Sequence, residues 1–298
     1  MEIGYLGLGK MGIAQVARLV EKNWRVVAWN RSEAPRLAAQ KLGAESIETI
    51  AEVCKKLEPP RLIWLMVPHG IVDEILTELL PHLSKGDTVI DGGNSFYKHS
   101  IRRAEGLARK GIAFLDCGTS GGPAGARNGA CLMIGGEKEI FRKYEQLFKD
   151  LAAPNAYARL GAAGAGHFVK MVHNGIEYGM MQALGEGFEV MKRSDFNLPL
   201  AEVARLYNKG SVIESRLVGW LAKAYAEHGE DLRDISGEVA QSGEGLWTVE
   251  TAKMLGVPVR VIKDSLKFRL TSRGNPSYTG QIVSALRNQF GGHTVHKR

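Results

Sequence analysis

The sequence predicts an α/β domain with a parallel-rich sheet, followed by an all-helical domain that begins with a long helix. In the first half of the chain, short apolar runs alternate with amphipathic stretches, as strands and helices do in βαβ units. A glycine-rich turn follows the first apolar run. After Pro154 the alternation stops, and a long helical pattern begins at His167. We therefore expect two domains, at residues 1–160 and 161–298.

The elements of the first domain follow from this alternation. Strands are expected at the apolar runs, at residues 3–6, 25–29, 61–67, 88–91, 112–117 and 130–134. Helices are expected at the amphipathic stretches between them, at residues 11–22, 32–41, 72–80, 101–110 and 138–150, with Ser32 as an N-cap. Right-handed connections would place the helices on both faces of the sheet.

The second domain is expected to contain helices only. A small, flexible junction at residues 161–166 leads into a helix at 167–193, roughly 40 Å long at the usual helical rise. Further helices are expected at residues 200–208, 213–227, 246–255 and 281–290. No strand is expected beyond the long helix.

Composition indicates a globular cytoplasmic protein. Hydrophobic residues make up 44% of the chain and charged residues 24%. Neither a signal peptide nor an apolar run long enough to span a bilayer is apparent. The three cysteines lack paired or zinc-binding spacing, which favours reduced thiols and no metal. The net charge of +7 comes from scattered Lys and Arg, so an anionic small molecule explains it as well as nucleic acid does.

Gly7, Gly9 and Gly12 form a G-x-G-x-x-G pattern between the first expected strand and helix. These glycines would permit a tight turn, approach of a pyrophosphate, and close helix–strand packing. The pattern predicts a Rossmann-type dinucleotide site; the alternative is a glycine-rich turn without a ligand. The residues between the glycines complete the candidate cofactor loop: Leu8, Lys10 and Met11.

The end of the second strand bears on cofactor choice. Asn30, Arg31 and Ser32 stand where an acidic residue would bind a ribose 2′-hydroxyl and repel a 2′-phosphate. Their chemistry favours NADP over NAD, unless Arg31 is merely a solvated surface residue. At another strand end, Met66 and Val67 could pack the nicotinamide ring.

Two further glycine-dense segments, 91–95 and 118–125, follow expected strands and should reach the same carboxyl edge of the sheet. Glycine there suggests that the backbone approaches a ligand closely, with Asn94 and Ser120 as hydrogen-bonding side chains. The alternative is two ordinary turns.

The start of the long helix carries a polar stripe. Its members share one face at helical spacing: Lys170, His173, Asn174, Glu177 and Tyr178. A buried lysine with a lowered pKa can accept the hydroxyl proton when a secondary alcohol is oxidised, and a carboxyl group two turns away can act as an acid. His173 and Asn174 could orient hydroxyl groups. Gly175 and Gly179 cost helix stability, which suggests close approach of a ligand or another backbone.

These motifs, in this order, resemble the 6-phosphogluconate dehydrogenases, in their short bacterial form, within the β-hydroxyacid dehydrogenase superfamily. The resemblance covers essentially the whole chain. It implies oxidative decarboxylation of 6-phosphogluconate to ribulose 5-phosphate, with Lys170 as the base at the C3 hydroxyl and Glu177 as the acid that protonates C1. It further implies that these residues contact the sugar acid: Asn94, Ser120, Gly121, Gly122, His173, Asn174 and Tyr178.

The chain's end resembles the family's C-terminal segment, in which an arginine and a histidine reach the partner subunit's site. The resemblance implies that Arg287 and His293 bind phosphate across a homodimer, and that Arg269 is another phosphate contact. Two departures matter. Leu246 stands where the family commonly has Arg or Lys, and Asn30 stands where many short forms have an acidic residue.

Two rival functions remain at this point. Another β-hydroxyacid dehydrogenase would oxidise an unphosphorylated 3-hydroxy acid without decarboxylation, and a binding module would hold a dinucleotide without turnover. We expect a small-molecule substrate and neither a nucleic-acid nor a membrane partner.

Overall fold

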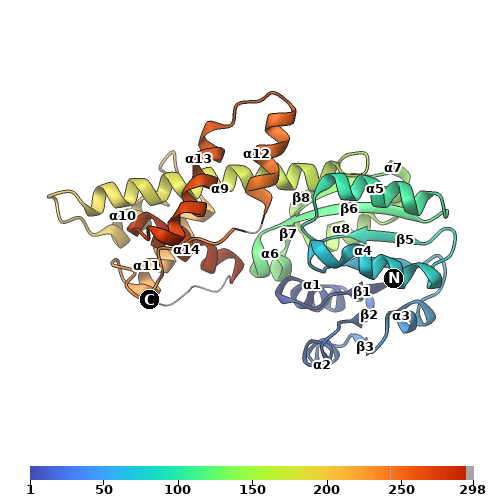
Figure 1. Cartoon of the computed structure of the whole chain (residues 1–298). Helices are drawn as coiled ribbons and strands as arrows, with labels where there is room; N and C mark the ends of the chain where they lie inside the picture. The colour runs from blue at the N-terminus through green and yellow to red at the C-terminus, as the bar shows by residue number, and fades with distance from the viewer. Residues whose placement is uncertain (242, 293–298) are drawn as a thin grey trace. The chain divides into compact units, whose positions relative to one another are not determined.

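The computed structural model describes residues 1–241 and 243–292, and it divides into two compact units, Met1–Lys170 and Met171–Arg298. The first unit is an α/β domain and the second is helical, which confirms the predicted fold class (Figure 1). The predicted domain boundary at residues 160 and 161 stays a prediction. Within the described residues, no helix is both long and apolar enough to cross a membrane.

The first unit is built on one sheet of eight strands in the order β3-β2-β1-β4-β5-β6-β7-β8. Its strands are β1 Glu2–Leu6, β2 Arg25–Trp29, β3 Glu45–Ile47, β4 Leu62–Leu65, β5 Thr88–Asp91, β6 Ala113–Ser120, β7 Ala130–Gly136 and β8 Ala152–Gly161. All neighbours are parallel except β6 and β7. The strand order reverses between β1 and β4, which is where dinucleotides bind in sheets of this kind.

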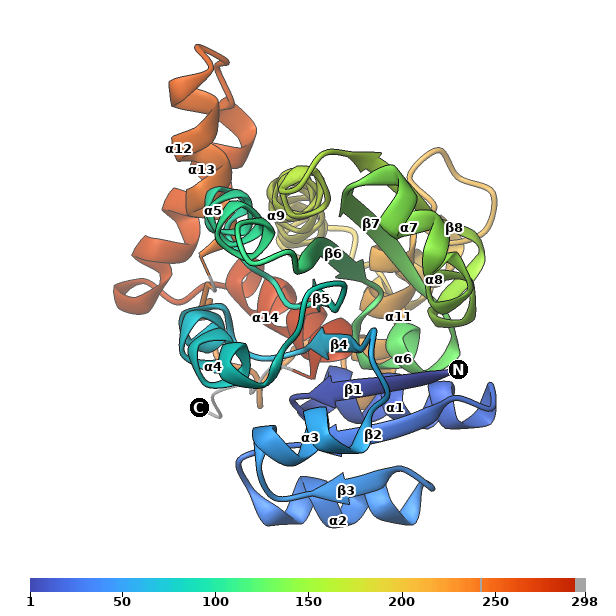
Figure 2. The ribbon, with the colours of Figure 1, turned by 90° about the vertical axis from the view of Figure 1, so that its right-hand side faces the viewer.

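Helices cover both faces of this sheet, as predicted (Figure 2). They are α1 Lys10–Glu21, α2 Glu33–Lys41, α3 Ile50–Lys56, α4 Val72–Leu79, α5 Tyr97–Ala108, α6 Gly122–Asn128, α7 Lys138–Lys143 and α8 Glu145–Leu151. Side chains of α1 and α8 fill the core on one face, and those of α3, α4 and α5 fill the core on the other. Both faces of the central strands are therefore buried, which explains their continuous apolar runs.

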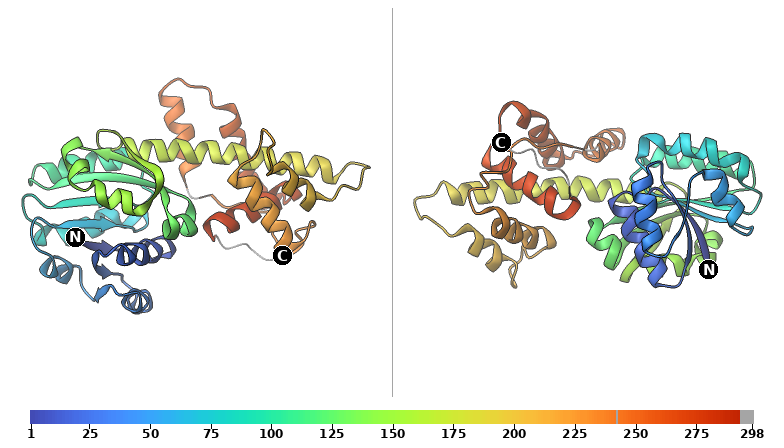
Figure 3. Two further views of the ribbon diagram at one scale, coloured as in Figure 1. Left: turned by 180° about the vertical axis from the view of Figure 1, so that it is seen from behind. Right: turned by 90° about the horizontal axis from the view of Figure 1, so that it is seen from below.

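The second unit packs helices around the long helix α9, Ala165–Lys192, which begins in the first unit and runs for 28 residues (Figure 3). The other helices are α10 Leu200–Tyr207, α11 Arg216–His228, α12 Glu244–Met254, α13 Arg260–Thr271 and α14 Tyr278–Gly291. Their core includes Phe188, Leu221 and Leu286.

The structure corrects several expected elements. The segment 138–150 is not one helix, because Tyr144 leaves helical geometry and separates α7 from α8. Strand β7 runs antiparallel to β6, since only the short helix α6 connects them. The sequence patterns did not reveal four elements of the first unit and one of the second: β3, α3, α6, β8 and α13.

Candidate active site

The predicted glycine loop joins β1 to α1 as expected. Gly7 has φ +104°, and a Cβ there would collide with the Met66 carbonyl; a Cβ at Gly12 would collide with the Gly7 carbonyl. Gly9 differs, because a Cβ there would meet nothing within 4 Å. Gly9 is also the N-cap of α1, whose first turn has no acidic residue. The loop therefore offers helix N–H groups beside open space, which suits a pyrophosphate.

The segment after β2 is held by hydrogen bonds to its neighbours. The Asn30 Oδ1 accepts from the Leu8 N–H at 3.0 Å, and its Nδ2 donates to the Ser32 carbonyl at 3.3 Å. Arg36 donates to the carbonyls of Asn30 and Arg31. Ser32 occupies the predicted N-cap position of α2, but its side chain makes no capping bond. The residues present fit the adenosine ribose of a nicotinamide dinucleotide, without an acidic side chain at the strand end.

The two residues after β4 lie at the same edge. Met66 donates its N–H to the Leu6 carbonyl at 2.7 Å, which links the end of β4 to β1. Val67 is buried, and a Cβ built at Gly7 would also touch its side chain. These residues therefore border the switch point between β1 and β4, where they were expected.

The loop after β5, which carries Asn94, is organised by a buried network that the sequence did not reveal. Asp91 accepts from the Gly93 N–H, the Ser95 hydroxyl and Arg103. Arg103 also donates to Asp73 on α4, at 2.8 Å. Asp91 is fully buried and Arg103 only 5% exposed, so their opposite charges compensate each other in a medium of low dielectric.

Lys170 lies on the first turns of α9, against the end of β6. A Cβ at Gly118 would collide with the Lys170 side chain, which is 8% exposed. Asp116 on β6 holds the start of this helix: its two carboxylate oxygens accept from the N–H groups of Gly164 and His167, at 2.6 and 2.7 Å. Asp116 therefore fixes the turn that precedes Lys170.

The remaining predicted residues of the first unit follow β6. Ser120 is the last residue of that strand, while Gly121 and Gly122, with φ +126° and +63°, form the turn into α6. Strands β5 and β6 are parallel neighbours, so Asn94, after the end of β5, and Ser120, at the end of β6, belong to the same edge of the sheet.

In the second unit, the polar stripe continues along α9. The His173 Nδ1 lies 3.1 Å from the Asn174 Oδ1 and 3.7 Å from a Glu177 carboxylate oxygen. Gly175 and Gly179 were expected to mark close approach of a ligand or another backbone, but side chains approach them instead: a Cβ at Gly175 would meet Thr248 of α12, and one at Gly179 would meet Val261 of α13. Their small size therefore serves helix packing within this unit.

Two buried arginines lie near this stripe. Arg269 is 2% exposed and stacks on Tyr178, with 3.3 Å between its guanidinium carbon and the ring centroid. Burial lowers the pKa of Arg269 to about 10, and burial also lowers the pKa of Arg287, which is 8% exposed. Glu177 and Glu244 attract both cations. The Arg269 Nη2 has no hydrogen-bond partner among the described residues, so the cluster retains donor capacity for an anion.

Two predicted features fall elsewhere. His293 lies outside the described residues. Leu246 is 39% exposed, whereas Glu244, two residues before it, is buried. Within the described part of the chain, no three His, Cys, Asp or Glu side chains group into a metal site.

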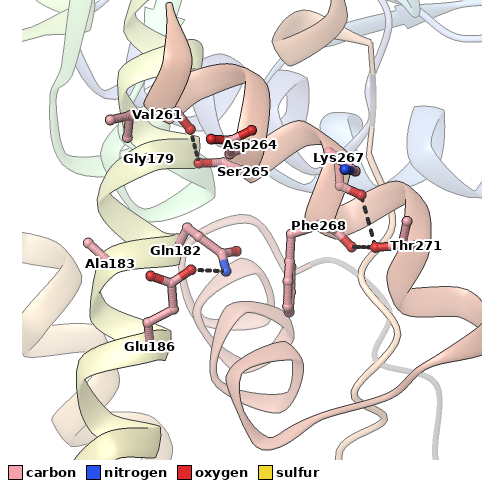
Figure 4. A pocket seen from close by; sticks show the side chains of 10 residues that line it. All are labelled: Gly179, Gln182, Ala183, Glu186, Val261, Asp264, Ser265, Lys267, Phe268 and Thr271. Atoms are coloured by element: carbon pink, nitrogen blue, oxygen red, sulfur yellow. Dashed lines mark hydrogen bonds between the residues drawn. The ribbon is translucent and has the colours of Figure 1, made fainter.

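A separate cavity lies between α9 and α13, beyond Tyr178 (Figure 4). Its volume is about 530 Å³. Gln182 donates to Glu186 at 2.7 Å on its α9 side, and the 68% exposed Val261 lies on its α13 side. None of the predicted catalytic or phosphate-binding residues lines it.

Two family models match consecutive parts of this chain. Residues 2–164 match the NAD binding domain of 6-phosphogluconate dehydrogenase, and residues 166–277 match the C-terminal domain of the same enzyme.

Individual proteins match over comparable lengths. A Bacillus subtilis protein with a provisional 6-phosphogluconate dehydrogenase name is 49% identical over 100% of both chains. A Haloferax volcanii protein, named as an NAD(+)-dependent, decarboxylating 6-phosphogluconate dehydrogenase, is 42% identical over 100% of this chain and 99% of its own. The 6-phosphogluconate dehydrogenase of Plasmodium falciparum superposes with a TM-score of 0.83 at 28% identity, over 96% of this chain and 70% of that one. This chain belongs to the 6-phosphogluconate dehydrogenase family.

Proposed function

We propose that this protein oxidises and decarboxylates 6-phosphogluconate to ribulose 5-phosphate and CO2 with NADP or NAD. The observation that carries the proposal is the continuous helix α9, on which Lys170 and Glu177 lie seven residues apart. Seven residues are close to two helical turns, so both side chains project from one face. A base and an acid on one face suit a reaction that removes a proton at one carbon and adds a proton at another.

A nicotinamide dinucleotide held by the glycine loop at the switch point would supply the hydride acceptor for C3 of the substrate. Lys170, as the neutral amine, takes the C3 hydroxyl proton as the ketone forms. The resulting ammonium then donates to the C3 carbonyl oxygen as the C1–C2 bond breaks: C1 leaves as CO2, and the electrons of that bond form the enediol between C2 and C3. Glu177 delivers a proton to C1 of the enediol, which is the former C2 of the substrate. His173 and Asn174 would orient the substrate hydroxyl groups.

The phosphate would bind Arg269 and an Arg287, the latter contributed by the partner subunit in the dimer proposed below. A dianion suits guanidinium donors that are already held in a low-dielectric cluster, and the Nη2 of Arg269 has unused donor capacity there. This part of the proposal distinguishes 6-phosphogluconate from an unphosphorylated 3-hydroxy acid. The relatives do not favour that alternative substrate. The sugar itself would contact Asn94, Ser120, Gly121, Gly122 and Tyr178.

The cofactor would bind the switch point, with NADP favoured over NAD. An uncharged Asn30 and the cationic Arg31 support this preference, although the Haloferax volcanii relative is named as NAD(+)-dependent. The proposed contacts are Gly7, Leu8, Gly9, Lys10, Met11, Gly12, Asn30, Arg31, Ser32, Met66, Val67 and Asn94.

One assay tests the function. The purified full chain, without added metal, is given 6-phosphogluconate or gluconate with each cofactor, while reduced nicotinamide and released CO2 are measured. We expect equal amounts of both products from 6-phosphogluconate and far less from gluconate. Equal activity on the two sugars would contradict the phosphate assignment, and reduction without CO2 would contradict decarboxylation.

We also propose a cytoplasmic homodimer in which Arg287 and His293 serve the partner's site. The cavity between α9 and α13 and the exposed Val261 beside it offer a surface for a second copy (Figure 4). Arg287 also lies near Glu177 of its own chain. An experiment is therefore needed to decide whether Arg287 acts in the site of its own subunit or in that of the partner.

Subunit mixing provides that test. Lys170→Ala and Arg287→Ala chains, each inactive alone, are refolded together. If Arg287 acts across subunits, a mixed dimer keeps one complete site and activity returns to about a quarter of the wild-type value, because half of the dimers are mixed and each has one of two sites. If Arg287 acts within its own chain, no activity returns.

A further inference from the structure

The exposed ion pair between Arg31 and Glu74 lies beside the expected adenosine ribose. The Arg31 Nη2 and the Glu74 Oε1 are 2.9 Å apart, and their side chains are 67% and 62% exposed. We propose that Glu74 is a specificity-determining residue: by holding the Arg31 guanidinium, it limits the preference for a 2′-phosphate and keeps NAD usable. This inference rests on the cofactor part of the proposed function.

The hydrogen bonds of the surrounding loop leave Arg31 as the cation on which the preference between NADP and NAD depends. Both ends of the Asn30 amide are used within the loop, and Arg36 is committed to two backbone carbonyls. The Arg36 side chain is mostly buried, and its Nη2 lies 3.9 Å from Glu48. The Arg31 side chain, by contrast, projects into solvent and pairs with a residue of another element. It can turn toward a ligand if Glu74 releases it.

The position of Glu74 is itself fixed. Asp73, its neighbour on the first turn of α4, accepts hydrogen bonds from Arg102 and Arg103 of α5. The Asp73 carboxylate thereby ties the first turn of α4 to α5, while the Glu74 carboxylate extends toward Arg31. Because α4 is anchored, Glu74 remains within reach of Arg31 without rearrangement of the backbone.

The charges of Arg31 and Glu74 then determine which cofactor binds more tightly. A 2′-phosphate requires a cation, and Glu74 both occupies that cation and repels a nearby phosphate. A ribose 2′-hydroxyl is neutral, so it suffers little from either effect. Exposed ion pairs are weak and screened by salt, so a phosphate can still displace Glu74. The effect of Glu74 is therefore graded, and both cofactors remain substrates.

The test compares Glu74→Gln with Glu78→Gln. Glu78 is exposed on the next turn of α4, so its substitution makes the same change in net charge. We measure kcat/KM for NADP and NAD with 6-phosphogluconate, and the Kd of each cofactor without sugar acid. Glu74→Gln should raise the NADP-to-NAD ratio about three- to tenfold, chiefly through tighter NADP binding, and Glu78→Gln should leave it unchanged. In an Arg31→Gln background, Glu74→Gln should raise the ratio much less, because only the direct repulsion between Glu74 and the phosphate is then removed.

An unchanged or lower ratio in Glu74→Gln would overturn the inference. An equal rise in Glu78→Gln would also overturn it, because the cause would then be overall charge. A rise of undiminished size in the Arg31→Gln background would overturn it as well, because Glu74 would then not act through Arg31. The binding measurements separate this outcome from failure of the proposed function. If wild-type protein binds both cofactors but does not turn over 6-phosphogluconate, the function fails while the Kd ratios still decide the role of Glu74.

Discussion

Arg103 in the first unit and Arg269 in the second are both buried, at 5% and 2% exposure. Arg103 donates to Asp73 and Asp91, and the latter carboxylate is fully buried. Arg269 instead stacks on Tyr178, and its Nη2 has no hydrogen-bond partner within the described residues. The first unit thus satisfies its buried cation internally and forms a rigid edge for a cofactor. The second unit leaves part of its cation's hydrogen-bonding capacity unused within the described residues.

The largest expected effect concerns Lys170, a buried side chain of the first unit that the proposed reaction would use as its base. Replacing it with alanine should lower kcat by about 10²- to 10⁴-fold, because the hydroxyl proton loses its acceptor. The Kd of each cofactor should change little, since the glycine loop and the segment after β2 are untouched. Steady-state kinetics and calorimetry measure the two effects. A variant that retains a tenth of the activity would remove Lys170 from the mechanism.

Arg103→Met should strongly affect stability. It leaves the fully buried Asp91 without its cation, and breaking a buried pair in this way costs about 3 kcal/mol of unfolding free energy. Arg102→Met is the matched control, because Arg102 bonds the same Asp73 but its side chain is 60% exposed. That change should cost less than about 1 kcal/mol. Urea unfolding compares them, and equal losses would mean that burial of the Asp91 pair does not matter.

Arg269→Met should affect substrate binding more than stability, unlike Arg103→Met. The KM for 6-phosphogluconate should rise about 10- to 100-fold, since hydrogen bonds to charged groups contribute roughly 1.5–3 kcal/mol. Stability should fall less than in Arg103→Met, because removing Arg269 also removes the cost of burying a charge. Arg273→Met, at an exposed position four residues later, is the control. A loss of stability as large as that of Arg103→Met, without a change in KM, would make Arg269 a structural residue.

The same contrast explains what the sequence could reveal. The glycine loop and the edge segments after β5 and β6 were predictable, because local glycine patterns follow apolar strand runs. Strand β8 was missed because Pro154 and Asn155 interrupt a segment in which only Ala152 is buried. Helix α13 was missed because exposed Val261 and Leu270 blur its apolar stripe. Arg103 could not be predicted as a site residue, since its partners come from β5 and α4 and meet only in the folded chain.

The smallest expected effect concerns Asp73, the half-exposed carboxylate that is hydrogen-bonded to Arg103. Hydrogen bonding from Arg103 lowers the pKa of Asp73 to about 2, from an ordinary 3.8. The unfolded chain therefore binds more protons at this residue between those two pH values, and the stability that Asp73 contributes is lost as pH falls through that window. Because the side chain is 55% exposed, we expect that contribution to be below about 1 kcal/mol. Asp73→Asn should accordingly be slightly less stable than wild type at pH 7.

The difference between Asp73→Asn and wild type should shrink as pH falls from 4 toward 2, because protonation makes the wild-type side chain neutral as well. Urea unfolding midpoints of both proteins at descending pH measure it. A difference that stays constant would mean that Asp73 anchors α4 through hydrogen-bond geometry and not through its charge. The first unit's network would then owe its ionic character to Asp91 and Arg103 alone, and the contrast with the second unit would rest on that one buried pair.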